Sequence, residues 1–346
     1  MGPRDCPWQK SNSQRVKLLG PVCVGYGHPD LERTHKYLDD FGMVKSFERE
    51  EAGAKTVYYR GYGVQPVIYI AKQTPKPEFF GVFFEAAGET DLGNATKIPG
   101  ASKIREFVEG GRVVDITDPS GMPFHVVFGM KKREFTPREN EVEPQNYPAP
   151  TDTDAAAKPR RGKFHRLTRG AIPIHKLGHC GYVPKDINAT CDFYCENFNF
   201  KPSDVLLDPN GEIMIIFMHV DLGKDYSDHH SFFLAQPFGP SVPGTTHHAA
   251  FEVESIDTQF VGHEYLQSKG YQAFWGVGRH IEGSQVFDYW FDLDGFLVEH
   301  YTDGDIVNEE HPITYVENRD LNSGSNWGPG PLMPKQGIPR QEKTIM

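Results

Sequence analysis

Residues 276–302, GVGRHIEGSQVFDYWFDLDGFLVEHYT, combine ionisable side chains with two otherwise apolar, strand-like segments. Val286–Phe291 and Phe296–Tyr301 are rich in aromatic and β-branched residues, and the Asp-Leu-Asp-Gly between them is typical of a turn. Tyr289 and Glu299 lie within this predicted hairpin. A carboxylate in an apolar strand is costly unless it is paired or bound to a metal. The hairpin therefore indicates an ion pair or a metal ligand at Glu299.

The turn also predicts which side chains share a face. If 293–295 is a three-residue loop with Gly295 in the left-handed conformation, Tyr289 lies directly across from Glu299. Both side chains then project from one face of the sheet, and His280 lies just upstream of the hairpin. We expect these polar groups to line a pocket on that face.

Two other strand-like segments carry histidines. His179 lies in HKLGHCGYV, and His248 lies in GTTHHAAFEVES, where a period of two sends His247 and His248 to opposite faces. Two histidines and a carboxylate such as Glu299, from separate strands, are the ligand set of a facial triad on non-haem Fe(II). Because the chain contains 15 histidines, residue types alone leave open that these are hydrogen-bonded strand histidines and an exposed glutamate.

The elements that must position these residues form an internal repeat. VGYGHPDLERTHKYLDDFGM (24–43) is similar to CGYVPKDINATCDFYCENFNF (180–200), with a strand, a Pro/Asp turn and an amphipathic helix in each. VVDITDPSGMPFHVVFG (113–129) is similar to the hairpin at 286–302. The strand–helix–strands pattern occurs twice in each copy, which predicts four βαβββ units, paired into two modules with curved mixed sheets. Helices segregated from such sheets make the fold class α+β.

Composition predicts where the modules begin and end. Polar, Pro-rich and charged segments without apolar periodicity read as a linker and a tail. The predicted parts are an N-terminal tail (1–18), an N-terminal module (19–133), a linker (134–170), a C-terminal module (171–317) and a C-terminal tail (318–346).

The bulk composition excludes several classes of protein. With a formal net charge of −11, we expect no nucleic-acid or anionic-membrane partner. No apolar run is long enough for a transmembrane helix, and the N-terminus has no secretory signal. Five cysteines, few and unevenly placed, suggest reduced thiols in a cytoplasmic protein.

The region from about 173 to 302 resembles the C-terminal module of type I extradiol ring-cleaving dioxygenases, which belong to the vicinal oxygen chelate (glyoxalase/bleomycin resistance/dihydroxybiphenyl dioxygenase) superfamily. The resemblance rests on LGH in the first strand, HHxAFEV in the third, and GRH followed by a Tyr and a Glu. The spacing from Tyr289 to Glu299 and from His280 to Glu299 also agrees with the pattern of that family. The whole two-module layout matches more loosely.

The resemblance implies a role for each of these residues. His179, His248 and Glu299 would be the metal ligands, with Fe(II) as the default metal and Mn(II) as an alternative. His247 would then point the other way, as a structural residue.

The resemblance also implies how a catecholic substrate would be handled. Tyr289 and His280 would hydrogen-bond the bound catecholate, and His230 would be the acid–base catalyst. The loop after His230 is longer than usual in the family, which leaves His229 as an alternative for that role.

The implied activity is extradiol cleavage of a catecholic aromatic ring with O2, by an enzyme of aromatic catabolism that assembles as a homo-oligomer. The N-terminal module carries Val22 or Cys23, Gly81 and His125 at the equivalent positions, so we expect no metal there. Three alternatives stay open. A 4-hydroxyphenylpyruvate dioxygenase shares the triad, but this sequence has no counterpart of its glycine-rich C-terminal helix segment. A glyoxalase-like isomerase shares the fold but needs ligands from both modules, and a non-catalytic small-molecule binding protein needs no acid–base residues.

Overall fold

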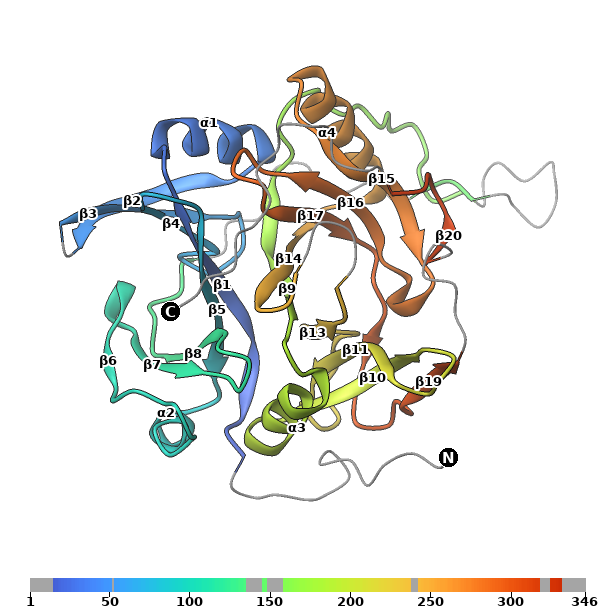
Figure 1. The fold of residues 1–346 in the computed structure, drawn as a ribbon. Coiled ribbons are helices and arrows are strands. Elements are labelled where there is room, and N and C mark those ends of the chain that lie inside the picture. The colour runs from blue at the N-terminus through green and yellow to red at the C-terminus, as the bar shows by residue number, and fades with distance from the viewer. Residues whose placement is uncertain are drawn as a thin grey trace.

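The computed structural model describes residues 15–51, 53–134, 145–147, 158–237, 242–317 and 324–331. Most of the predicted N-terminal tail and parts of the predicted linker and C-terminal tail lie outside these ranges. Two curled β-sheets lie side by side, with the α-helices on their outer surfaces (Figure 1).

The first sheet has eight strands in the order β2-β3-β4-β1-β5-β8-β7-β6. Its elements are β1 (Leu18–His28), α1 (Leu31–Phe41), β2 (Val44–Glu51), β3 (Ala54–Arg60), β4 (Tyr69–Gln73), β5 (Glu78–Ala86), α2 (Glu89–Ala95), β6 (Arg105–Glu106), β7 (Arg112–Thr117) and β8 (Pro123–Phe128).

The second sheet has ten strands in the order β19-β10-β11-β13-β9-β14-β17-β16-β15-β20. Its elements are β9 (Ile174–Val183), α3 (Ile187–Asn197), β10 (Phe200–Leu207), β11 (Ile213–Val220), β13 (Phe232–Ala235), β14 (Thr245–Val253), α4 (Ile256–Ser268), β15 (Ala273–His280), β16 (Val286–Phe291), β17 (Leu297–Thr302), β19 (Thr314–Glu317) and β20 (Ser325–Trp327). The short strands β12 (Ser227–Asp228) and β18 (Ile306–Val307) pair separately.

The strand orders confirm the predicted internal repeat and the α+β fold class. Each module consists of two βαβββ units, which join through β1–β5 in the first sheet and β9–β14 in the second. Only the second sheet gains a further strand at each edge. Its β19 pairs with β10, and β20, from within the predicted C-terminal tail, pairs with β15.

The first helix of each module begins where the sequence predicts it. Asp30 and Asp186 cap α1 and α3, and each carboxylate accepts a hydrogen bond from a backbone N–H in the first turn. Such a bond satisfies one of the donors that a helix start leaves free. Gly42 ends α1 with a φ of 104°, a left-handed conformation that glycine adopts without steric cost.

Aromatic side chains join the two modules into one core. Phe84 and Phe124 of the first module lie 6.2 and 5.9 Å from the ring of Phe232 in the second. The Tyr182 hydroxyl donates to the Pro123 carbonyl at 2.6 Å and accepts from the backbone N–H of Val82 at 3.2 Å. The modules are therefore packed together as one body.

Two predictions from composition can be compared with the structure. Cys23, Cys180, Cys191 and Cys195 are free and buried. Within the described ranges, no helix has the length and apolarity needed to cross a membrane.

Candidate metal centre

Three adjacent strands in the middle of the second sheet bring His179, His248 and Glu299 together. In the register of β9, β14 and β17, Ala250 pairs with both His179 and Glu299. His248 lies two residues before Ala250 on the same strand and pairs with Gly181. The three side chains therefore come from neighbouring positions on one face, as side chains two apart along a strand do.

The polar atoms of the three side chains converge. Glu299 Oε2 lies 3.2 Å from His179 Nε2 and 3.1 Å from His248 Nε2, and the two Nε2 atoms are 3.2 Å apart. Glu299 is 0 % exposed, His179 1 % and His248 4 %. We call these three residues the triad. It is the one group of three or more His, Cys, Asp or Glu side chains in the described part of the chain with metal-ligand spacing.

The triad keeps a charge in the interior. Burial would raise the pKa of the Glu299 carboxyl, but the adjacent imidazoles of His179 and His248 outweigh burial and lower it. Burial lowers the pKa of His248. Both carboxylate oxygens of Glu299 are buried and have no hydrogen-bond partner among the described residues. Buried polar atoms without partners are rare and call for an explanation, such as an ion that belongs there.

The spacing of the triad fits a metal ion. Ligand atoms about 2.2 Å from one ion and at right angles to one another lie about 3.1 Å apart. The three observed separations of 3.1–3.2 Å match this value. Imidazole nitrogens with a carboxylate oxygen also suit Fe(II) or Mn(II).

Tyr289 and His280 form a hydrogen-bonded pair beside the triad. Tyr289 pairs directly with Glu299 across β16 and β17, and Gly295 has a φ of 88°, as the turn sequence predicts. Nδ1 of His280 faces the Gly324 carbonyl at 3.2 Å, so this nitrogen carries a proton, because a carbonyl oxygen can only accept. Burial lowers the pKa of His280 to about 4, so its Nε2 accepts from the Tyr289 hydroxyl at 2.8 Å.

His230 and His229 occupy different environments. The ring of His230 lies 4.2 Å from that of His179 and lines the cavity beside the triad. His229 turns toward Asp204, with its Nε2 2.9 Å from a carboxylate oxygen, while its Nδ1 lies 3.2 Å from Nδ1 of His230. Burial and the neighbouring His179 lower the pKa of His230. This geometry favours His230 over His229 as a group that a bound molecule could touch.

The prediction that His247 points to the opposite face from His248 is wrong. Both rings line the same cavity, and their Nδ1 atoms are 2.8 Å apart. The reason is a register shift between Thr246 and His248, where β14 has one residue more than the facing part of β9. Such a bulge interrupts the alternation of side chains between faces.

Two glycines beside His179 make room for aromatic rings, a role that the LGHCG motif does not reveal alone. A Cβ atom at Gly178 would lie 1.8 Å from the Tyr301 hydroxyl, and one at Gly181 would lie 1.8 Å from the Phe233 ring. The Phe233 ring packs 4.8 Å from the ring of His248. The glycines therefore let these rings pack closely around the triad.

A small cavity opens beside the triad, with a volume of about 110 Å³. An apolar cavity of roughly 150 Å³ in another protein accepts benzene, so this volume has the scale of one aromatic ring. Its apolar walls are Leu206, Met214, Ile215, Phe217, Phe233, Phe274, Trp275 and Leu297. Among the described lining residues no lysine or arginine occurs, and Glu282 is the one acidic side chain.

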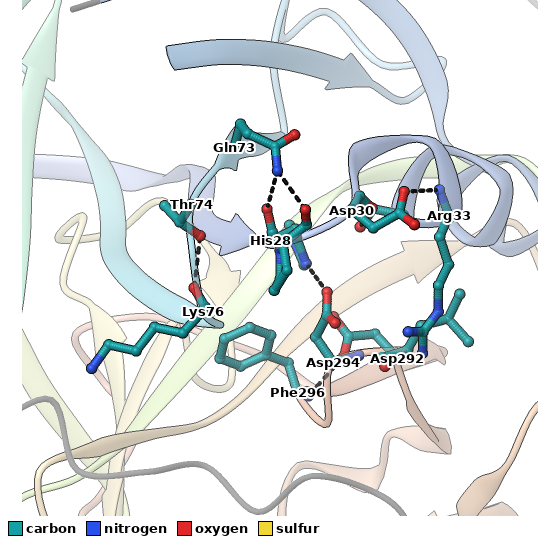
Figure 2. Close-up of polar contacts among 12 residues, drawn as sticks. His28, Asp30, Arg33, Gln73, Thr74, Lys76, Asp292, Asp294 and Phe296 are labelled. Atoms are coloured by element: carbon teal, nitrogen blue, oxygen red, sulfur yellow. Dashed lines mark hydrogen bonds and ion pairs between the residues drawn. The ribbon is translucent and has the colours of Figure 1, made fainter. Parts of the chain in front are cut away.

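The N-terminal module holds the tip of the hairpin that carries Tyr289 and Glu299 (Figure 2). His28 is fully buried, and its Nδ1 lies 2.7 Å from the Asp294 carboxylate while its Nε2 lies 2.8 Å from the Tyr69 hydroxyl. Arg33 donates a hydrogen bond to the Leu293 carbonyl. The first module thus fixes the position of an element of the candidate site.

Known proteins are similar to all or part of this chain. The model of the Glyoxalase/Bleomycin resistance protein/Dioxygenase superfamily matches residues 176–300, which include the whole triad. Residues 176–300 belong to this superfamily. Metapyrocatechase 2 of Cupriavidus necator is 27 % identical over 308 residues, covering 87 % of this chain and 86 % of that protein.

Several solved structures share the fold of this chain over most of its length. The Mn(II)-bound glyoxalase of Novosphingobium aromaticivorans has a TM-score of 0.72 at 19 % identity, over 94 % of this chain and 96 % of that one. Homoprotocatechuate 2,3-dioxygenase of Brevibacterium fuscum, in complex with 3,4-dihydroxyphenylacetate, has a TM-score of 0.70 at 18 % identity, over 92 % and 91 % of the two chains. The 2,3-dioxygenase LapB of Pseudomonas sp. KL28 has a TM-score of 0.68 at 16 % identity, over 88 % and 98 %. The resemblance to extradiol dioxygenases is confirmed, and at these identities the structural matches establish the fold alone.

Proposed function

We propose that this protein is an extradiol dioxygenase, which cleaves the ring of a catechol with O2 at a single Fe(II). The observation that carries the proposal is the buried triad of His179, His248 and Glu299, with separations that suit one ion. Mn(II) would fit the same ligands. The relative named metapyrocatechase supports the reaction class.

The triad would hold the metal through Nε2 of His179, Nε2 of His248 and a carboxylate oxygen of Glu299. A bound ferrous ion would supply a chelation site for the two catechol oxygens and electron density for O2. Nδ1 of His248 would then donate to Nδ1 of His247, 2.8 Å away. Such a hydrogen bond orients a ligating imidazole and fixes its tautomer.

The residues around the triad would bind the substrate and move its protons. When the substrate binds, the Tyr289 hydroxyl would turn its single proton from His280 to the ionised catechol oxygen, and Tyr289 and His280 together would hold the ring in one orientation. His230, buried against His179, would take up and return a proton during ring opening. The hydrogen bond from His229 to Asp204 would hold His229 in place beside His230.

The walls of the cavity favour an uncharged substituent on the substrate. A carboxylate-bearing catechol would leave its charge in an apolar site, because the described lining residues include no cationic side chain. Phe217, Phe274 and Trp275 would instead pack against an alkyl or aryl group. We therefore propose an apolar catechol as the substrate.

The test loads the metal-free protein anaerobically with Fe(II), and in parallel with Mn(II), and then adds catechols in air. Stoichiometric O2 uptake with a yellow ring-opened product is expected, faster for alkyl- or aryl-substituted catechols than for 3,4-dihydroxyphenylacetate. A metal-loaded protein that binds catechol without O2 uptake would contradict the dioxygenase and favour the isomerase or the non-catalytic binding protein. Assembly as a homo-oligomer and a cytoplasmic location stay predictions from the sequence.

A further inference from the structure

A second cavity, larger than the one beside the triad, lies in the N-terminal module. It has a volume of about 1290 Å³ and lies on the inner face of the N-terminal sheet. The strand pairing shows that this cavity lies at the position in the first module that corresponds to the candidate metal centre in the second. Phe83 pairs with Cys23 and His125, just as Ala250 pairs with His179 and Glu299. The first module thus keeps a cavity at the place where the second has its candidate site.

This cavity is not built for a metal. Nδ1 of His125 lies 2.7 Å from Asp115, and its Nε2 lies 2.6 Å from the Phe80 carbonyl, so both ring nitrogens are engaged. Burial would raise the pKa of Asp115, but hydrogen bonds from His125 and from Arg105 outweigh burial and lower it. Burial raises the pKa of the Cys23 thiol, which is therefore protonated. No free ligand remains at the three equivalent positions.

The cavity is rich in uncompensated positive charge. Arg49, Lys72, Lys76 and Lys185 line it, and within the described part of the chain none of them has an ion-pair partner. The carboxylate of Asp115 is already bound by Arg105 at 2.6 Å and by His125. The remaining acidic lining residues are Glu78 and Glu106, so cations outnumber free carboxylates. The cavity is therefore locally positive, although the net charge of the whole chain is −11.

Aromatic rings form the walls between these cations. The ring of Phe83 stacks on Phe107 at 5.0 Å and on His125 at 4.1 Å. Lys72 Nζ lies 5.4 Å from the centre of the Phe80 ring. Figure 2 shows Lys76 extending away from the contacts around His28, and its carbonyl accepts from Thr74 Oγ1 at 2.7 Å, which fixes the turn before β5.

We propose that the N-terminal module binds an organic anion with a planar, conjugated skeleton and a carboxylate. The aromatic walls would stack on the skeleton, and Lys72 and Lys185 would neutralise the carboxylate. The volume is far larger than one ring requires, so the cavity can admit a fused two-ring anion. Two sources share this chemistry, namely an aryl carboxylate from outside and the ring-opened carboxylate that catechol cleavage would yield.

Calorimetric titration of the metal-free full-length protein with 2-naphthoate tests the proposal. One site per chain is expected, with an affinity that falls as salt rises. Lys72→Glu combined with Lys185→Glu should weaken binding at least about 100-fold, since two contacts to a charged group would be lost. The matched control is Lys97→Glu, on an exposed residue outside the cavity, which should bind like wild type. Circular dichroism establishes that each variant is folded.

Additional measurements distinguish binding in this cavity from binding at the triad, and distinguish the two possible sources of the ligand. His248→Ala should bind 2-naphthoate like wild type, so the result does not depend on catechol cleavage. Uncharged 2-naphthalenemethanol should bind much more weakly. Competition by the ring-opened product of catechol would identify the product as the source, and its failure to compete would identify an external aryl carboxylate.

Absence of binding to wild type, or binding lost in His248→Ala yet kept in the Lys72/Lys185 variant, would overturn the proposal. Dissociation of a wild-type oligomer by the Lys72/Lys185 substitutions, without 2-naphthoate binding, would assign the cavity to a second copy of the chain and would also overturn it.

Discussion

The two modules share one strand order but differ in the side chains at equivalent positions. The second module places two histidines and a glutamate around one point, whereas the first has a protonated cysteine, a glycine and a histidine engaged at both nitrogens. The equivalent pairs are Cys23 and His179, Gly81 and His248, and His125 and Glu299. The same backbone arrangement can therefore support different kinds of site, because a few side chains on one face of the sheet determine what it can bind.

The turns, in contrast, are nearly the same in both modules. Asp118 accepts from the backbone N–H groups of Ser120 and Met122, and Asp292 accepts from those of Asp294 and Phe296, all at 2.8–2.9 Å. The hairpins β7–β8 and β16–β17 therefore keep the same register from the same carboxylate-bridged turn. The two modules therefore share the turn and differ in the side chains at the paired strand positions.

The sharpest test of this contrast removes one residue from each module at the same ladder position. Glu299→Ala should abolish stoichiometric binding of Fe(II) and lower ring cleavage by more than about 100-fold, since even residues that only support a ligand can cost that much. His125→Ala, its counterpart, should keep wild-type metal content. Metal analysis and O2 uptake measure both variants. Full iron retention in Glu299→Ala, or iron loss in His125→Ala, would contradict the assignment.

The second prediction concerns the acid–base group, which has no counterpart role in the first module. His230→Phe should keep the metal and still bind catechol, but lower the rate of ring cleavage by roughly 10²–10⁴-fold. His229→Phe should have a smaller effect, because this residue turns toward Asp204. Rapid-mixing kinetics compares the two variants. The reverse order of effects would transfer the role to His229.

The third prediction compares two glycines at equivalent positions, Gly181 and Gly25. Gly181→Ala should lower the free energy of unfolding by roughly 1–3 kcal/mol through overpacking, because its Cβ would lie 1.8 Å from the Phe233 ring. Gly25→Ala should cost less, since its Cβ would lie 3.1 Å from Phe80 Cβ beside an open cavity. Urea unfolding of the metal-free proteins measures both. Equal costs would mean that the packing around the triad is no tighter than in the first module.

The smallest expected effect concerns the two turn carboxylates, which should behave alike. Burial raises the pKa of both Asp118 and Asp292 to about 6. Between about pH 4 and about pH 6 the folded protein retains protons that the unfolded chain has released, so each group lowers the free energy of unfolding as pH rises, by up to about 1.4 kcal/mol per pH unit. Asp118→Asn and Asp292→Asn should each reduce, by a similar amount, the fall in the free energy of unfolding between these pH values. Urea unfolding across that range tests it, and an unchanged pH dependence in either variant would show that its carboxyl has an ordinary pKa.

Features that depend on short-range geometry were predictable from the sequence. A three-residue turn with Gly295 sets the pairing of Tyr289 with Glu299, so the hairpin register was predictable from local residues. The repeated strand, Pro/Asp turn and helix likewise predicted both modules and their fold class. The motif spacings were sufficient to propose the triad, although its role as a metal site stays a prediction.

The way in which strands distant in sequence meet could not be predicted from local residues, because it depends on the packing of the whole chain. The bulge that turns His247 into the cavity arises from the pairing of β14 with β9, and no local signal in the HHAAFEV segment reveals it. The same holds for the bond from His28 to Asp294, whose partners are 266 residues apart. The cation-rich cavity of the first module also exists only once the two sheets have packed, because Lys185 and Phe296 reach it from the second module. Side-chain alternation is a property of one strand, whereas bulges, contacts between modules and cavities are properties of pairs of elements.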